Sequence, residues 1–513
     1  MTVPREKLPA STSNPLPWTF LAVALGVGTL LKVVAATSSL WLDELHSLGH
    51  GLQPDLAGVF EHTHFDFHAP LFFTAIHVVG SWQHPHFSKI LTILVSGLTL
   101  IPLAAIARRL NGGRFCVVVA CGLFSTMPYF TYYGQELRPY AFLMLATVTA
   151  TWAAWCDDGP PWLRGTIFGI AVGVGLNSQY LMTIAVLGIG ASRIFTAWPW
   201  RHVRDNPPLS MRALIGTGAL GALLIVPWIL GYMSWAIENP NDLVPTDVQT
   251  SGLAWREFLE APLRMFAPRI NTLGSWRVPL AIGAMAGTLG AVAFGSILWL
   301  RARSTSSERP FTSRVAAQAF VLLVILVPLT GFLSIRSWGR VGLQYYSIAA
   351  FAFPLVAAEV LASISNTKLR NTLAGFLLLC SLAGGVAQAF AVPREDMERG
   401  VDVVRQEIAR VRTLGIGEPW ISAVMRQPNI FEHRLAYSAY GADLNAVEPR
   451  ELPVRGDPGF ERPVILLVRR WDDFMNATTE RQEAVRRLHD GRVVERQIKI
   501  DDAISVFVLI PPR

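Results

Sequence analysis

The feature that most constrains this chain is a series of apolar runs, each about as long as a bilayer is thick. About 20 helical residues cross the hydrocarbon of a membrane, and runs of that length recur as far as residue 391. Residues 165–198 form a longer run that Asn177-Ser178-Gln179 interrupts, so we interpret it as two short spans joined by a polar turn. The expected fold class is mainly α, a polytopic helical membrane bundle of about eleven spans. The other runs lie at 17–39, 87–107, 115–133, 138–156, 212–235, 277–300, 315–335, 343–364 and 371–391.

The composition excludes other classes of protein. Hydrophobic residues make up 51% of the chain and charged residues only 16%, with a mean hydropathy of +0.37. A wholly soluble or disordered chain carries more charge than this. The 4 cysteines all lie in apolar runs, which argues against a disulfide framework.

The net charge of +7 reflects topology. If the spans alternate in direction, the loops rich in Lys and Arg all fall on one side, which the positive-inside rule assigns to the cytoplasm. We therefore expect a multi-pass protein of the cell inner membrane with a cytoplasmic N-terminus, and no binding of nucleic acid. The basic residues are Arg5, Lys7, Arg108, Arg109, Arg114, Arg164, Arg193, Arg201, Arg204, Arg212, Arg301, Arg303, Arg309, Arg314, Lys368 and Arg370.

From residue 392 the pattern becomes that of a soluble domain. Val401, Val404, Ile408 and Val411 recur at helical spacing and predict an amphipathic helix over 395–413. Together with the other elements, this predicts a small α/β domain over 392–513, outside the cytoplasm and accessory to the membrane domain 1–391. Those elements are strands at 421–424, 464–468 and 504–510 and a second helix at 479–490.

Polar residues that are costly near a membrane gather on the outer side. Asp43 and Glu44 follow directly after the first span, at the start of an outer loop over 40–86. Charged groups in such places serve a site, a pair or an interface. The pair is open to two interpretations, a solvated helix cap or catalytic carboxylates. Lys32, inside the first span, is interpreted as extending toward the outer headgroups, with a role in binding a ligand as the alternative.

A second cluster, His64, Asp66 and His68, lies later in the same loop. In an extended chain these alternate residues share a face, which would suit a divalent metal. The same groups can instead hydrogen-bond one another and a polar substrate. Both interpretations remain open.

A third cluster occupies the tight outer turn between the third and fourth spans. It holds Gln135, Glu136, Arg138 and Tyr140. An arginine binds a phosphate through two parallel hydrogen bonds. The alternative role for Arg138 is an ion pair with Glu136 or with an acid of the first outer loop.

Taken in order, three segments resemble motifs of the GT-C superfamily of membrane glycosyltransferases. They are Asp43-Glu44, His68-Ala69-Pro70-Leu71 and Gln135-Glu136-Leu137-Arg138-Pro139-Tyr140. The resemblance covers the membrane part of the chain and is closest to the bacterial branch of protein O-mannosyltransferases and the lipid A aminoarabinose transferase. Ala69 stands where the family has proline, and Leu137 where it has a small residue. Gln344-Tyr345-Tyr346 stands where relatives often have Arg-Tyr, which leaves Arg336 or Arg340 to supply the positive charge.

The resemblance implies transfer of a sugar, with inversion, from a polyprenyl-phosphate donor to a lipid, glycan or protein acceptor outside the cytoplasm. Asp43 would be the base, with Glu44 as a helper or a replacement. Arg138, Arg340 and His68 would bind the donor phosphate. No cofactor is required, and a divalent metal at His64, Asp66 and His68 is the open alternative. The further substrate-binding candidates are His64, Asp66, Gln135, Glu136, Tyr140 and Tyr345.

Two other functions are weighed against this one. A lipid or glycan transporter or flippase would show repeats and polar groups in mid-membrane, whereas here the polar groups gather at the outer ends of the spans. A non-catalytic scaffold or sensor would not need the pair Asp43 and Glu44. The sequence therefore favours a glycosyltransferase of the cell envelope.

Overall fold

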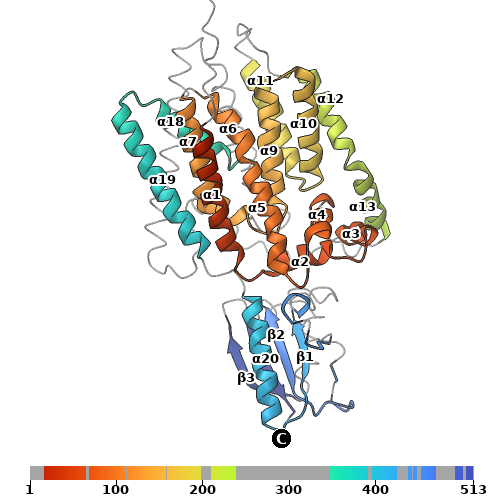
Figure 1. Cartoon of the computed structure of the whole chain (residues 1–513). Helices are drawn as coiled ribbons and strands as arrows, with labels where there is room; N and C mark the ends of the chain where they lie inside the picture. The colour runs from red at the N-terminus through yellow and green to blue at the C-terminus, as the bar shows by residue number, and fades with distance from the viewer. Residues whose placement is uncertain are drawn as a thin grey trace, which may run out of the picture.

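The protein consists of a helical bundle with a smaller sheet domain at one end (Figure 1). The fold is mainly helical, as expected from the sequence. The computed structural model describes residues 17–64, 69–110, 112–156, 159–197, 209–238, 347–390, 396–424, 437–441, 443–447, 452–453, 455–469, 492–500 and 504–511.

The helices of the bundle coincide with the predicted apolar runs. The run at 165–198 is two helices, as predicted, and the predicted spans at 277–300 and 315–335 lie outside the described residues. The helices are α1 (Trp18–Ala36), α5 (Lys89–Leu98), α6 (Leu100–Arg108), α7 (Arg114–Thr126), α8 (Pro128–Tyr133), α9 (Tyr140–Trp155), α10 (Pro161–Leu176), α11 (Met182–Ala197), α12 (Met211–Leu223), α13 (Val226–Glu238), α18 (Ala352–Ala362) and α19 (Thr367–Ala389).

Three helical segments of the described chain are long and apolar enough to cross a membrane: Trp18–Ala36, Pro85–Arg108 and Thr367–Ala389. A fourth is the pair Met211–Leu223 and Val226–Ser234, which bends by 47°. The chain is therefore a membrane protein, and the count of about eleven spans stays a prediction.

Small residues let some helices of the bundle approach closely. At the crossing of α10 and α12, a Cβ added to Gly221 would collide with the carbonyl oxygen of Gly169. Close backbone approach at glycine is a common way of packing helices in membranes, where apolar burial alone does not drive association.

The first outer loop contains helices, which the sequence analysis did not predict. They are α2 (Leu42–Gly51), α3 (Leu56–Thr63), α4 (Leu71–Val79) and the 3-10 helix η1 (Pro85–Ser88). The side chain of Asp55 caps α3 by accepting a hydrogen bond from the Gly58 amide. Buried leucines at helical spacing hold α2 against the bundle: Leu42, Leu45 and Leu48.

The sheet domain has one helix, α20 (Met397–Thr413), and four strands in the order β1-β2-β4-β3. Strands β1 and β2 pair in parallel, and the other pairs are antiparallel. The strands are β1 (Trp420–Val424), β2 (Val464–Arg469), β3 (Val493–Lys499) and β4 (Ile504–Ile510).

Most of this domain agrees with the sequence prediction. Helix α20 and strands β1, β2 and β4 lie where the periodicity placed them, and the helix predicted at 479–490 lies outside the described residues. Strand β3 was missed because it is an edge strand whose side chains are almost all exposed, so it has no apolar face.

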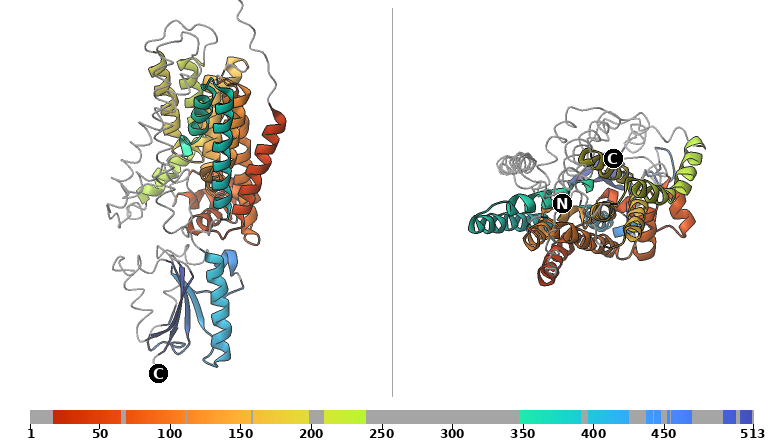
Figure 2. Two further views of the ribbon diagram at one scale, coloured as in Figure 1. Left: turned by 90° about the vertical axis from the view of Figure 1, so that its left-hand side faces the viewer. Right: turned by 90° about the horizontal axis from the view of Figure 1, so that it is seen from above.

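The sheet domain lies at the end of the bundle that carries α2 (Figures 1 and 2). The start of α1, the α6–α7 junction and the start of α19 lie at the opposite end (Figure 1). That end carries Arg108, Arg109, Arg114, Lys368 and Arg370. Among the described residues, the basic groups at the α6–α7 junction and at the start of α19 therefore share one end of the bundle, and the acidic pair lies at the other.

Candidate functional site

The acidic pair forms the first turn of α2 and places its two carboxylates in different surroundings. Asp43 is partly buried and Glu44 is buried. Among the described residues, no hydrogen bond or ion pair reaches the Asp43 carboxylate, whereas Glu44 is surrounded by donors. The two acids are therefore not equivalent.

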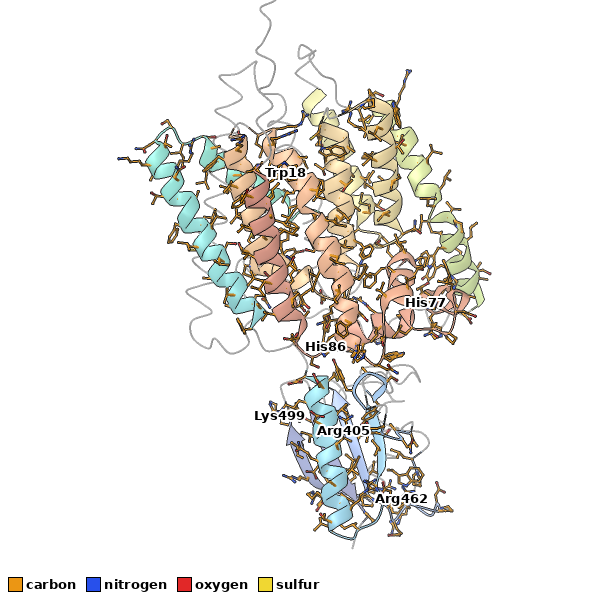
Figure 3. The ribbon with its side chains drawn as sticks, viewed as in Figure 1. Trp18, His77, His86, Arg405, Arg462 and Lys499 are labelled. Carbon is orange, nitrogen blue, oxygen red and sulfur yellow. The ribbon has the colours of Figure 1, made fainter. Side chains whose placement is uncertain are left out.

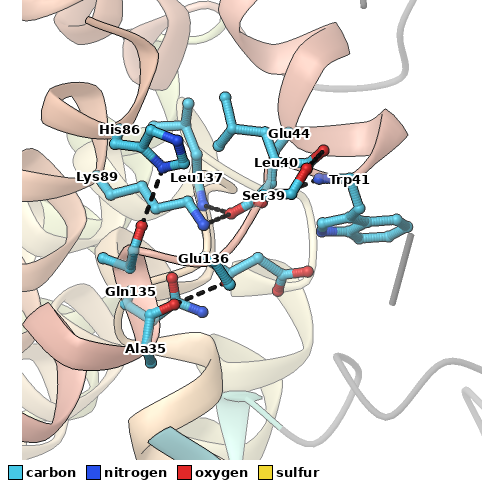
Figure 4. Close-up of polar contacts among 12 residues, drawn as sticks. Ala35, Ser39, Leu40, Trp41, Glu44, His86, Lys89, Gln135, Glu136 and Leu137 are labelled. Carbon is cyan, nitrogen blue, oxygen red and sulfur yellow. Dashed lines mark hydrogen bonds and ion pairs between the residues drawn. The ribbon is translucent and has the colours of Figure 1, made fainter. Parts of the chain in front are cut away.

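The Glu44 carboxylate joins three segments (Figure 4). One oxygen, Oε1, lies 3.2 Å from Nζ of Lys89 and accepts a 2.8 Å hydrogen bond from the Leu137 amide. The other, Oε2, accepts a 3.3 Å hydrogen bond from the Trp41 amide. The carboxylate thus ties the start of α2 to α5 and to the turn after α8.

Lys89 was not identified from the sequence. Its side chain is 1% exposed, and that of Glu44 is 2% exposed. Burying a charge is costly unless it is paired. A lysine at the start of an apolar run indicates that its charge needs a partner. The sequence does not show that this partner is Glu44, which is 45 positions away.

Arg138 brings the first and third motifs together. Its buried guanidinium donates from Nη1 to the Asp43 carbonyl at 3.4 Å and to Ser47 Oγ at 3.2 Å. Ser47 Oγ in turn donates to the same carbonyl at 3.0 Å. The cation therefore lies against the helix turn that carries Asp43.

The other residues of the third motif support this turn. The Gln135 carbonyl accepts a 3.1 Å hydrogen bond from Thr92 Oγ1, and Glu136 Oε1 accepts a 3.3 Å hydrogen bond from the Tyr132 hydroxyl. The ring of Tyr140 meets that of Tyr133 edge-on at 5.4 Å. The predicted residues Gln135, Glu136 and Tyr140 thus lie together and are buried.

The structure corrects the interpretation of Lys32 that the sequence suggested. The side chain does not extend toward headgroups: it is buried, and Nζ donates to the Gly28 carbonyl at 3.3 Å. A Cβ added to Gly134 would collide with Cε of Lys32. The same Cβ would lie 2.5 Å from the Phe130 carbonyl oxygen, so a glycine suits the tight turn that precedes the third motif, and Lys32 packs against this turn.

The predicted histidine and aspartate cluster is described only at His64, which follows α3 with its ring 6.1 Å from that of Trp228. Asp66, His68, Arg340 and Tyr345 lie outside the described residues. Within the part of the chain that the structure describes, no group of three His, Cys, Asp or Glu side chains is arranged to hold a metal ion.

The sequence did not predict that His46 and His50 of α2 would lie close to His62 of α3. The ring of His50 lies 6.1 Å from that of His46, 6.2 Å from that of His62 and 5.3 Å from that of Phe73. Burial lowers the pKa of His62 and of His64 below the usual value, and the Glu61 carboxylate opposes this in both. The lowered pKa values mean that His62 and His64 favour the neutral form.

The chain is similar to known proteins in part of its sequence and in its fold. Residues 72–230 match the family described as dolichyl-phosphate-mannose-protein mannosyltransferase. The structure of ArnT from Cupriavidus metallidurans bound to undecaprenyl phosphate is similar over 96% of this chain and 97% of that chain, with a TM-score of 0.54 and 12% identity.

A weaker similarity, with a TM-score of 0.46 and 13% identity, is to the Archaeoglobus fulgidus oligosaccharyltransferase in complex with Zn and sulfate. It covers 82% of this chain and 61% of that chain. No curated protein sequence matches the chain. The resemblance to the GT-C superfamily is confirmed by the family match and by the ArnT-like fold.

Proposed function

We propose that this protein is a membrane glycosyltransferase that moves a sugar, with inversion, from a polyprenyl-phosphate donor to an acceptor outside the cytoplasm. The match of residues 72–230 to a mannosyltransferase family supports this proposal, as does the similarity to ArnT, whose structure holds undecaprenyl phosphate. In this proposal the N-terminus is cytoplasmic, residues 1–391 form the catalytic domain, and residues 392–513 form an outer accessory domain.

The observation that carries the proposal is the contrast between Asp43 and Glu44. Glu44 is engaged by Lys89 and by two backbone amides, so it is suited to positioning. Among the described residues, no hydrogen bond or ion pair engages the Asp43 carboxylate, and the guanidinium of Arg138 donates to the backbone carbonyl of the same residue. Such a base beside a cation is what transfer from a phosphate leaving group needs.

In the proposed reaction Asp43 takes the proton of an acceptor hydroxyl as the oxygen attacks the anomeric carbon. The bond from that carbon to the phosphate oxygen breaks on the opposite face, and the electron pair leaves with the lipid phosphate. Because phosphate leaves readily, one displacement suffices. No covalent enzyme intermediate is required, and the anomeric configuration inverts.

Arg138 is proposed to stabilise the negative charge that grows on the phosphate. A guanidinium suits this role because it is always charged and presents parallel donors. His68 and Arg340 are proposed as further phosphate ligands. The proposed substrate contacts are His64, Asp66, Gln135, Glu136, Tyr140 and Tyr345.

The scheme includes no metal step. A divalent metal at His64, Asp66 and His68 is tested by treating the purified protein with EDTA and measuring both its metal content and its transfer rate. Unchanged transfer by metal-free protein would exclude a required metal. Loss of transfer that added metal restores would show that the scheme is incomplete.

The function is tested first in cells. We expect a deletion strain to lose one sugar from its envelope lipids, glycans or proteins, measured by mass spectrometry. The gene for the wild-type chain restores that sugar, and Asp43→Asn at equal expression does not. Restoration by Asp43→Asn would overturn the assignment of the base. An unchanged set of envelope sugars, with altered distribution of a lipid between leaflets, would favour a flippase.

A further inference from the structure

The sheet domain contacts the chain just before the acidic pair. Tyr440 Oη accepts a 2.7 Å hydrogen bond from the Leu40 amide, and Ser39 Oγ accepts a 3.1 Å hydrogen bond from the Glu398 amide. Tyr440 and Glu398 belong to the sheet domain, whereas Ser39 and Leu40 connect α1 to α2. Consecutive residues of the connection are thus held from the other domain.

His86 reinforces this contact from the bundle side and lies at the junction of the two domains (Figure 3). Its Nδ1 lies 3.1 Å from the Ala36 carbonyl, and its Nε2 lies 3.9 Å from the Glu398 carboxylate. Its ring lies 6.1 Å from that of Tyr440. The end of α1, η1 and α20 therefore meet at one point.

The apolar interior is also continuous across this junction. Buried side chains of α2 and α4 belong to one cluster with those of α20 and the sheet. Interfaces between domains of one chain are often polar and mobile, whereas this one shares a core. The cluster includes Leu40, Leu42, Leu45, Phe72, Met397, Val401, Ile465 and Val506.

These contacts hold the residues that directly precede the proposed base in the chain. Tyr440 holds the amide of Leu40, and Glu44 holds the amide of the next residue, Trp41, which is the N-cap of α2. Asp43 lies on the first turn of that helix. Leu40 is fully buried, so its amide has no access to water if the Tyr440 oxygen is removed, and an unsatisfied buried amide is unfavourable.

We infer that the C-terminal domain is a positioning element of the active site, which sets the start of α2, and with it Asp43, through the contact of Tyr440 with Leu40. This inference rests on the proposed function for its catalytic consequence. Tyr440 is a positioning residue, since it acts through the backbone before Asp43. The domain thus has a role in catalysis besides any contact with the acceptor.

The test compares two tyrosines that each lose one hydroxyl. Tyr440→Phe removes the acceptor for Leu40. Tyr437→Phe is the matched control, because the buried Tyr437 hydroxyl donates to the Ser422 carbonyl within the sheet domain. Ser39→Ala is a second variant, which removes the acceptor for the Glu398 amide from the bundle side.

The first readout is hydrogen exchange of the full-length protein in detergent, without any ligand. We expect Tyr440→Phe to speed exchange of the peptide covering 38–47 by roughly threefold to tenfold, the range of one lost hydrogen bond. Ser39→Ala should change the same peptide, and Tyr437→Phe should leave it as in the wild type. Equal exchange in Tyr440→Phe and Tyr437→Phe would overturn the inference.

The second readout is transfer from a panel of undecaprenyl-phosphate sugars. Tyr440→Phe should lower kcat by roughly threefold to tenfold with KM for the donor unchanged, and Tyr437→Phe should change neither. A kcat equal to that of the wild type would refute the positioning role. If the wild type uses no donor in the panel, the proposed function fails, and the exchange comparison still decides whether the domain sets α2.

Discussion

Asp43 and Glu44 illustrate how two adjacent carboxylates acquire different roles. Glu44 faces the bundle and accepts hydrogen bonds from the amides of Trp41 and Leu137 while it pairs with Lys89. None of these donors reaches the Asp43 carboxylate among the described residues, and Arg138 donates to the Asp43 backbone carbonyl. Glu44 therefore joins three segments of the chain, and Asp43 is the carboxylate that we propose for proton transfer.

Arg138→Lys tests the proposed phosphate contact. A lysine keeps the charge but loses the paired donors, so we expect the rate at low donor concentration to fall by about 100-fold. The measurement is the initial rate as a function of donor concentration. Arg164→Lys is the matched control, because Arg164 is also buried but donates to the Cys156 carbonyl, far from the acidic pair along α9. Equal losses in both variants would show that Arg138 has no specific role.

The sequence identified Asp43 and Arg138 because charged residues beside apolar runs are conspicuous. It did not identify Lys89, or the contact of Tyr440 with the Leu40 amide, because the partners, Glu44 and Leu40, are distant in the chain. Periodicity shows which face of an element is buried, but it carries no information on which buried polar groups pair. Lys32 is a different case, because its hydrogen-bond partner, the Gly28 carbonyl, is only four residues away, whereas the turn at Gly134 that packs against it is distant in the chain.

At the scale of elements, α2 is held by one buried ion pair to α5. Lys89→Met would leave the Glu44 carboxylate buried without its cation, so we expect a loss of about 3–5 kcal/mol in the free energy of unfolding. The double variant Glu44→Gln with Lys89→Met should recover part of this loss, because neither charge then remains. Denaturation in detergent measures Lys89→Met, Glu44→Gln and the double variant. Strictly additive effects would show that the two side chains do not interact in the folded protein.

The two histidines at the end of α3, His62 and His64, should make the stability of the folded protein depend on pH. The folded-state pKa values of His62 and His64 are lowered by burial. The stabilisation that comes from keeping these imidazoles neutral is therefore fully present above their pKa in the unfolded chain, about 6.5. It is lost as pH falls through the folded values. We expect the thermal midpoint to fall between about pH 7.5 and 5.5, and to fall less in His62→Gln. An equal decrease in both proteins would assign the effect to other groups.

The helices α2, α3 and α4 could have been found by the same periodicity that located α20. The many polar residues of the loop obscure the helical spacing of Leu42, Leu45 and Leu48, which lie among them. Strand β3 is a different case. Its side chains are nearly all exposed, so no apolar pattern marks it, and only its pairing with β4 defines it.

At the scale of the whole molecule, the bundle separates a basic end from the end that carries the acidic pair and the sheet domain (Figure 1). The proposed orientation is tested by labelling intact cells with a membrane-impermeant maleimide. Leu414→Cys, at an exposed site after α20, should react in intact cells. Lys368→Cys, exposed at the basic end, should react only after lysis. The reverse pattern would invert the topology and place the acidic pair in the cytoplasm.

The central claim is that this chain transfers a sugar from a lipid phosphate by means of Asp43. The most direct measurement uses purified protein, a panel of radiolabelled polyprenyl-phosphate sugars, and envelope material from a deletion strain as acceptor. We expect the wild type to transfer label from at least one donor, and Asp43→Asn to be slower by at least about 100-fold. Transfer by Asp43→Asn at the wild-type rate would contradict the account.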